Sequence, residues 1–278
     1  MAATKENPII LYDIPNVNGA SCARYQHNNW SRRLSLNYKG LPYRIEYVAY
    51  PDIEPKMKAL GVAPVSNTFP YYTLPVIADP SSHPDGKPTY VADSFEIAVY
   101  LDDKYPTPTY PAIFAPGTRS LQHILTTQYY PATVSNIRLT IMPRMLHLFD
   151  ARSVEYLKRT RGHMLEPYPD DVISQKWAEA EEKFSSLSKS AELNDGTKDA
   201  GPFITGPTVS FIDFALGGLI HWVKSIEGED SSYLKKIFEW QGGRWKRHWE
   251  GIQKIENMSS QGSFALSLTI QDVVLSNT

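Results

Sequence analysis

Cysteine is nearly absent from this chain, since Cys22 is the only one among 278 residues. A single cysteine cannot form an intrachain disulfide, which excludes the small disulfide-stapled domains of secreted proteins. Long apolar runs are missing too, because no stretch approaches the roughly 20 uncharged apolar residues of a membrane span. The residues after Met1 contain no apolar segment typical of a secretory signal. We therefore expect a cytoplasmic protein that does not enter a membrane.

The chain also lacks an excess of charge of either sign. It has 28 Lys and Arg residues against 30 Asp and Glu residues, a formal net charge of −2. This balance excludes the broad basic surface with which proteins bind nucleic acid or anionic lipid. At about 100–200 residues per domain, the length allows one large domain or two ordinary ones. We expect a globular protein whose partner is a small molecule.

The beginning of the chain predicts a strand, a helix and a second strand. The apolar run at 9–12 lies between prolines, as in a buried strand. From Trp30 onward apolar residues recur every four positions, and Gly40 stands where a left-handed residue ends a helix. Residues 45–50 then alternate like a second strand. This order favours a parallel, right-handed βαβ crossover.

The next segment predicts a short helix within 54–61 and two further strands. An apolar run at 72–78 is typical of a strand in which Pro75 lies at the beginning or the edge, because proline cannot donate to a ladder. A turn-rich link separates this run from another strand at 89–91. Both runs are short enough to belong to one compact sheet.

A helix is predicted directly after the last strand. Asp93 or Ser94 is expected to cap its beginning, and the apolar stripe continues to about Tyr105. Residues 1–106 therefore form a βαβ-ββα unit, a sheet combined with helices.

Residues 107–278 change character, and helical periodicity replaces alternation. A polar linker at 194–201 precedes a helix that begins at Ser210, whose spacing to Asp213 is that of a capping box with a structural role. The expected fold class is thus an α/β domain followed by an all-α domain. The other helix-period segments span 117–149, 153–165 and 170–187.

This order of elements resembles the glutathione transferases, which combine a thioredoxin-like amino-terminal domain with a helical one. The resemblance rests on residues 72–77, 91–102 and 210–213 in that order. Residues 30–43, 50–55 and 156–161 are further similar to fungus-specific class A transferases, which are related to bacterial β-etherases. The likeness covers roughly residues 8–250 and implies a homodimer.

The resemblance implies a glutathione site at two places in the first domain. It implies a cis bond at Pro75, which would let the backbone of Leu74 pair with the cysteinyl unit of the tripeptide. Ser94 would bind the γ-glutamyl carboxylate, and Asp93 the ammonium group or a neighbouring network. The amino terminus of a helix favours a carboxylate. On the residues alone, a plain helix cap explains Asp93 and Ser94 better, and only the resemblance favours the binding role.

Activation of the glutathione thiol requires a donor near the sulfur, because the thiolate is the nucleophile. The family places a serine four residues before the tryptophan that matches Trp30, and an asparagine two residues before it. The chain has Gln26 and Asn28 at these positions, so the serine is missing. Both amides can stabilise a thiolate without taking its proton, and we expect Asn28 and Gln26 to be catalytic.

Other residues compete for this role. Ser21 and Cys22 lie in a loop nearby, and a cysteine nucleophile would change the reaction to thiol–disulfide exchange. Tyr12 stands in the strand where some transferases carry a catalytic hydroxyl, although an aromatic in an apolar run is usually core. His27 can titrate near neutral pH, although it is more simply explained as a solvated loop histidine.

The second substrate is expected between the two domains, over the sulfur. Tyr129, Tyr130 and Met142 are the expected substrate-binding residues, with Met145 and Trp222 beside them. Aromatic and methionine side chains accept flat, apolar molecules, although such stripes also occur in ordinary helical cores.

The sequence thus predicts a glutathione S-transferase that conjugates glutathione to hydrophobic aromatic compounds, or cleaves their ethers with it, in detoxification. No metal ion is needed for this reaction. The alternative is a carrier that keeps the tripeptide site but binds aromatic molecules with little turnover.

Overall fold

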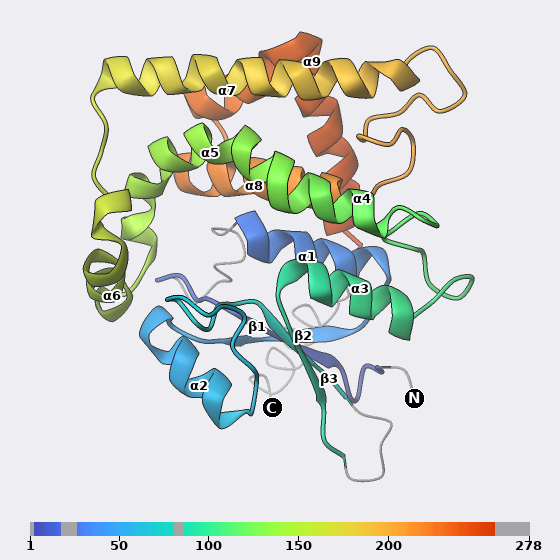
Figure 1. Cartoon of the computed structure of the whole chain (residues 1–278), viewed down its shortest axis with the longest axis vertical. Coiled ribbons are helices and arrows are strands. Elements are labelled where there is room, and N and C mark those ends of the chain that lie inside the picture. Colours follow the sequence, from blue (N-terminus) through green and yellow to red (C-terminus); the bar gives the residue numbers. More distant parts are fainter. Residues whose placement is uncertain (1–2, 18–26, 81–85, 259–278) are drawn as a thin grey trace, which may run out of the picture.

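The structure is a computed structural model that describes residues 3–17, 27–80 and 86–258, with the backbone alone at 27–32. Figure 1 shows a small sheet with its helices in the lower half of the molecule and a layer of longer helices above it. Among the described residues, none of the helices has the length and apolar character to cross a membrane.

The sheet has four strands in the order β2-β1-β3-β4. The pair of β1 with the edge strand β2 is parallel, because a crossover that contains a helix connects these two strands, while the other two pairings are antiparallel. Leu11 on β1 lies opposite both Ile45 and Ile77. The expected βαβ-ββα order is confirmed. The strands are β1 (Ile9–Asp13), β2 (Tyr43–Tyr47), β3 (Val76–Asp79) and β4 (Thr89–Ala92).

Two predicted strands have different bounds. The strand predicted at 45–50 covers Tyr43–Tyr47, because Pro51 begins a 3-10 turn, η2 (Tyr50–Asp52), which continues into α2 (Ile53–Ala59). The strand predicted at 72–78 begins only at Val76. The bond before Pro75 is cis, and the residues before it leave the ladder.

Two helices lie between the sheet and the upper layer. α1 (His27–Tyr38) connects β1 to β2 and ends before Gly40, whose φ of +65° is the left-handed conformation that glycine accepts readily. α3 (Ser94–Lys104) follows β4 and begins with Asp93 as its cap. α1 packs against α3 and, more extensively, against α8 (Phe211–Glu227) of the upper layer.

The segment expected to be helical over 117–149 is broken into several pieces. Pro131 and Pro143 lack the N–H group that a continuous helix needs, and each stands in the first turn of a new piece. The pieces are α4 (Arg119–Ile124), a π-helical turn η3 (Leu125–Tyr129), α5 (Tyr130–Ile141) and the 3-10 segment η4 (Met142–Leu148).

The rest of the upper layer surrounds α8, which is buried along most of its length. The capping box at its beginning is present, and Asp213 also accepts from the backbone N–H of Ile204 at 2.8 Å. The last helix, which the sequence analysis did not identify, is interrupted at Gln241–Gly243, where φ is positive. The helices are α6 (Ala151–Arg161), α7 (Asp170–Ala191) and α9 (Ser232–Glu256), with short turns η5 (Gly162–Met164) and η6 (Glu192–Asn194).

A buried ion pair holds the segment that connects the two layers. Lys39 Nζ lies 2.8 Å from Asp102 Oδ1, and the side chains are 0% and 7% exposed. Lys39 also donates to the backbone oxygens of Tyr105 and Pro111, while Asp102 accepts from the N–H groups of Ile113 and Phe114. Every strong donor and acceptor of the pair is therefore used, which a buried pair requires.

Asp102→Asn should lower the free energy of unfolding by about 3 kcal/mol, because it leaves the buried Lys39 charge uncompensated. Asp103→Asn is a matched control on the same helix, since Asp103 pairs with Arg119 while the two side chains are 61% and 45% exposed. The control should cost less than about 1 kcal/mol. Urea unfolding followed by circular dichroism measures both, and equal losses would contradict the assigned role of Asp102.

Candidate active site

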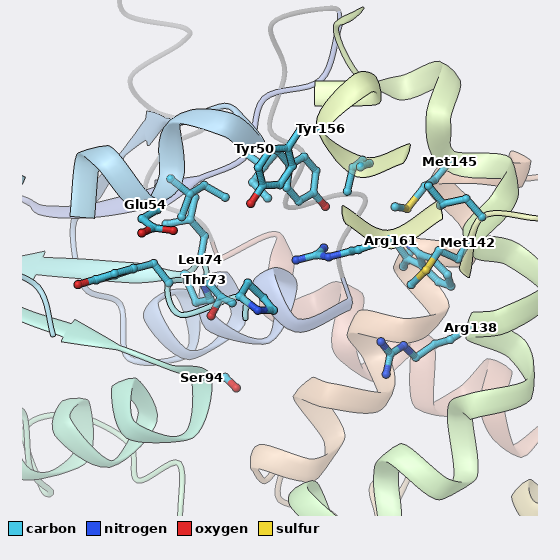
Figure 2. A pocket seen from close by; sticks show the side chains of 18 of the residues that line it. Tyr50, Glu54, Thr73, Leu74, Ser94, Arg138, Met142, Met145, Tyr156 and Arg161 are labelled. Carbon is cyan, nitrogen blue, oxygen red and sulfur yellow. The ribbon is translucent and has the colours of Figure 1, made fainter. Parts of the chain in front are cut away.

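A cavity of about 220 Å³ lies between the sheet layer and the upper helices. Figure 2 shows side chains entering it from both sides. Residues after β2, before β3 and at the beginning of α3 form one wall, while α5, η4, α6 and α8 form the other. The two walls come from distant parts of the sequence, so the cavity exists only in the folded chain.

The first wall offers backbone groups at Leu74. The Leu74–Pro75 bond is cis, as the resemblance implied, and both residues are buried and line the cavity. Within the described residues, neither the N–H nor the C=O of Leu74 has a hydrogen-bond partner. A peptide backbone group in the cavity can therefore pair with Leu74 like an added strand.

The beginning of α3 lies on the same wall. Asp93 Oδ1 accepts from the N–H of Phe95 at 2.8 Å and, more weakly, from that of Glu96 at 3.4 Å. Within the described residues, Oδ2 of Asp93 and the hydroxyl and N–H of Ser94 have no partner. Ser94 is half-buried, and its hydroxyl faces the open space in Figure 2. The helix dipole and a free N–H group at this position favour a carboxylate.

Asp93 adopts a strained backbone conformation, with φ 74° and ψ 145°. A residue with a side chain pays roughly 1–3 kcal/mol for such a conformation and keeps it only where its surroundings enforce it. Its two hydrogen bonds to α3 supply part of that enforcement. This conformation also sets the direction in which the chain enters α3, and so the place of Ser94 in the cavity.

A stack of aromatic rings joins the two walls, since Tyr50 belongs to η2 of the sheet layer and Tyr156 to α6 of the helical layer. The rings of Tyr50 and Tyr156 lie nearly parallel, 20° apart, with their centroids separated by 6.4 Å. Phe149 packs edge-on against Tyr50 at 5.3 Å. Met142 and Met145 continue this surface toward Trp222 of α8. This surface of rings and methionines is therefore suited to a flat, apolar molecule.

Two arginines extend from the helical wall into the cavity. Arg138 comes from α5, and Arg161 comes from the end of α6. The guanidinium of Arg161 lies 5.7 Å from the ring centre of Tyr50. Burial, and after it the positive charge of Arg161, lower the pKa of the Arg138 guanidinium below its ordinary value. The Nε atom of Arg138 is buried with no hydrogen-bond partner.

Most of the predicted binding residues meet in this cavity. Leu74, Pro75, Asp93, Ser94 and Met142 all line it. The neighbouring residues named with Met142 in the sequence analysis, Met145 and Trp222, line it as well.

The two adjacent tyrosines of the prediction lie elsewhere. Tyr130 is buried, its hydroxyl donates to the backbone oxygen of Ala215 at 3.0 Å, and its ring borders a smaller cavity of about 190 Å³ beyond Ser94. Tyr129 is 37% exposed in the π-helical turn and does not line the larger cavity. Their role in substrate binding stays a prediction.

Only some of the candidates for thiol activation lie within the described residues. Asn28 lies in the first turn of α1, while Gln26, Ser21 and Cys22 lie outside the described residues, as does the chain beyond 258. Tyr12 is buried and absent from the cavity wall. Burial first, and then the charge of Glu46, raise the pKa of Tyr12 to about 12. The Tyr12 hydroxyl is therefore a poor alternative to the amides.

The two arginines and the aromatic stack are absent from the residues predicted for the site. Arg138 shares one helical face with Met142 and Met145 at a spacing of four and seven residues, so a search for charges within apolar stripes would have found it. Tyr50, Tyr156 and Arg161 carried the family resemblance, but no local pattern indicates that they meet.

Arg138→Met should raise the free energy of unfolding by about 1 kcal/mol, because it removes a buried polar group without a partner while keeping the apolar stem. Arg144→Met removes an arginine of the neighbouring segment that pairs with Glu227, and should lower it by less than about 1 kcal/mol. Urea unfolding measures both changes. A loss of stability in Arg138→Met would show that this side chain has a structural role.

Comparison with known proteins gives the family. Residues 30–104 match the model of the glutathione S-transferase amino-terminal domain, and residues 120–254 match that of the carboxy-terminal domain. The chain is 28% identical over 280 residues to the glutathione S-transferase-like protein ustS of Aspergillus flavus, covering 96% of this chain and 98% of ustS.

Solved structures agree with this result. The glutathione transferase GSTFuA3 of Phanerochaete chrysosporium is 33% identical, with a TM-score of 0.77 over 89% of this chain and 97% of its own. A glutathione S-transferase of Ceriporiopsis subvermispora, solved in complex with glutathione, is 31% identical, with a TM-score of 0.78 over 90% of this chain and 98% of its own. The β-etherase LigF of a Sphingobium strain has a TM-score of 0.57 at 12% identity, over 91% of this chain and all of its own, so it shares the fold alone.

Proposed function

Because this chain belongs to the glutathione transferase family, with glutathione as its co-substrate, we propose that it conjugates glutathione to hydrophobic aromatic compounds. The observation that carries the proposal is the position of Leu74 and Ser94 on one wall of the cavity, opposite an aromatic wall. Detoxification is the role that fits a pocket with weak discrimination of shape.

The first wall matches the two ends of the tripeptide. The cysteinyl unit pairs with the unpartnered backbone groups of Leu74, in the manner of an added strand. The γ-glutamyl carboxylate binds the N–H and hydroxyl of Ser94 at the beginning of α3, and the free Oδ2 of Asp93 accepts from the ammonium group. The sulfur then points toward the helical wall.

The reaction begins when the bound thiol loses its proton to solvent. The amides of Asn28 and Gln26 stabilise the thiolate by donating to it, which lowers the pKa of the thiol from about 8.5. The sulfur attacks an electrophilic carbon of the aromatic compound, the carbon–sulfur bond forms, and the leaving group departs with its electron pair. Cleavage of an ether follows the same course, with an alkoxide or phenoxide as the leaving group.

The aromatic compound lies against the stacked rings of Tyr50 and Tyr156 and against Met142. Tyr129 and Tyr130 are kept as candidates for a more distant part of a larger substrate. We further propose a homodimer located in the cytoplasm, where glutathione is reduced and the single cysteine fits.

A carrier function is the alternative, because Gln26 stands where the family has a serine. Turnover of chlorodinitrobenzene with glutathione distinguishes the two. An enzyme exceeds the buffer rate, whereas a carrier retains glutathione and binds an aromatic dye but leaves that rate unchanged.

Ser94→Ala should raise the Kd for glutathione about tenfold, since it removes one hydrogen bond to a charged group. Ser231→Ala is the matched control, because Ser231 caps α9, accepting from the N–H of Leu234, and does not line the cavity. The control should cost about 1 kcal/mol of stability and leave the Kd unchanged. Calorimetric titration measures the Kd, and an unchanged value in Ser94→Ala would remove this residue from the site.

Asn28→Ala should raise the pH at which the bound thiolate forms by about one unit, because one donor to the sulfur is lost. Ultraviolet absorbance of the thiolate, followed as a function of pH, measures this shift. Asn29→Ala replaces the adjacent amide and should leave the titration in place. An unmoved titration in Asn28→Ala, with glutathione still bound, would show that another group activates the thiol.

A further inference from the structure

The charges that line the cavity do not balance. Of its two carboxylates, Glu54 pairs with Lys58 at 2.6 Å, and Asp93 caps α3 on the wall opposite the arginines. Its two guanidinium groups, on Arg138 and Arg161, have no carboxylate partner and no hydrogen bond within the described residues. The helical wall therefore presents positive charge that nothing in the described chain neutralises.

Neighbouring arginines differ from these two. Arg144, in η4, pairs with Glu227. Arg152, in the first turn of α6, pairs with Asp52 at 2.8 Å. Partly buried arginines are ordinarily paired, because an unpaired polar group away from water costs free energy. The lowered pKa of Arg138 expresses the same cost. An arrangement that costs stability is typical of a site that waits for a ligand.

We propose that Arg138 and Arg161 form an anion subsite for the acceptor, so that the preferred aromatic substrates carry a carboxylate. This proposal rests on the transferase function proposed above and adds the charge of the second substrate to it. A guanidinium group binds a carboxylate through two parallel N–H groups, which suits a planar oxyanion better than a neutral group of the same size.

The position of the arginines assigns them to the acceptor. Both come from the helical wall, together with Met142 and Tyr156, and face the wall that carries Leu74 and Ser94 (Figure 2). The Arg161 guanidinium lies against the ring of Tyr50, which belongs to the aromatic stack. A ring placed on this stack would therefore have a cationic group at its edge, and a ring with a carboxylate would satisfy both features at once.

A matched pair of substrates tests this subsite. A chloronitrobenzoate and the corresponding chloronitrobenzamide have nearly the same shape and differ in charge, and both release chloride on attack by glutathione. Each rate is divided by the uncatalysed rate, which corrects for their unequal reactivity. The preference is the ratio of the corrected kcat/KM values for benzoate and benzamide.

Arg161→Met should lower this preference about tenfold or more, as expected for the loss of a charge-assisted hydrogen bond. The corrected kcat/KM for the benzamide should change less than about twofold. Arg138→Met should act in the same direction, and Arg161→Lys should retain part of the preference because it keeps the charge. Arg159→Met is the matched control, since Arg159 is exposed on the same helix, lies 5.8 Å from the Tyr156 ring centre and does not line the cavity. The control should leave the preference unchanged.

Two outcomes would overturn the proposal. If Arg161→Met raises the KM for glutathione and leaves the preference intact, the arginines bind the carboxylates of the tripeptide. If benzoate and benzamide lose rate equally, the arginines shape the cavity without selecting charge. Circular dichroism of each variant shows that it is folded.

A binding experiment separates this proposal from the proposed function. Anilinonaphthalene sulfonate and neutral phenylnaphthylamine share a scaffold and fluoresce when bound, so their affinities need no turnover. Arg161→Met should lower the affinity for the sulfonate dye about tenfold relative to the affinity for the neutral dye, even if the wild-type chain conjugates neither substrate. An unchanged ratio of dye affinities would overturn the anion subsite, whereas wild-type protein that does not bind glutathione would overturn the transferase function.

Discussion

The packing of α1 against α8 is the contact on which the site depends, and among the elements that the structure describes it is the most extensive. Each helix belongs to one layer, so burial of their shared apolar surface holds the two layers in one arrangement. Tyr38 meets Phe214 edge-on at 5.9 Å, and Phe95 of α3 meets Phe211 at 5.4 Å. Because the cavity walls come from different layers, this packing sets the distance between them.

The two walls of the cavity provide different kinds of recognition. The sheet layer offers backbone groups at Leu74 and a helix terminus at Ser94, which are held in place by the fold and suit one invariant co-substrate. The helical layer offers aromatic rings, methionines and two arginines, whose shape and charge depend on side chains alone. A family can therefore keep the first wall and vary the second, so that the same thiol reacts with different acceptors.

Two local costs in free energy fall in the site. Asp93 holds a backbone conformation that favours glycine, and Arg138 keeps a buried Nε atom without a partner. Both costs fall on residues that line the cavity, while the buried pair of Lys39 and Asp102, outside it, is fully satisfied. A ligand in the cavity can complete the polar groups of Asp93 and Arg138.

Local chemistry determined much of the fold from the sequence alone. Pro75 stands at the beginning of a strand, Asp93 caps a helix, and the capping box from Ser210 to Asp213 begins another, because each effect acts within a few residues. The predicted bounds failed at 45–50 and 72–78, where a proline ended or delayed the strand, and across 117–149, where Pro131 and Pro143 divided the helix.

Tertiary structure decided which side chains share the cavity. Helical spacing places Arg138 on the same helical face as Met142. It does not predict that the hydroxyl of Tyr130 donates to the backbone oxygen of Ala215 on another helix. Tyr50 and Arg161 are far apart in the sequence and meet because α6 folds back over η2. Periodicity tells which face of an element is buried, and only the packing of whole elements tells what covers that face.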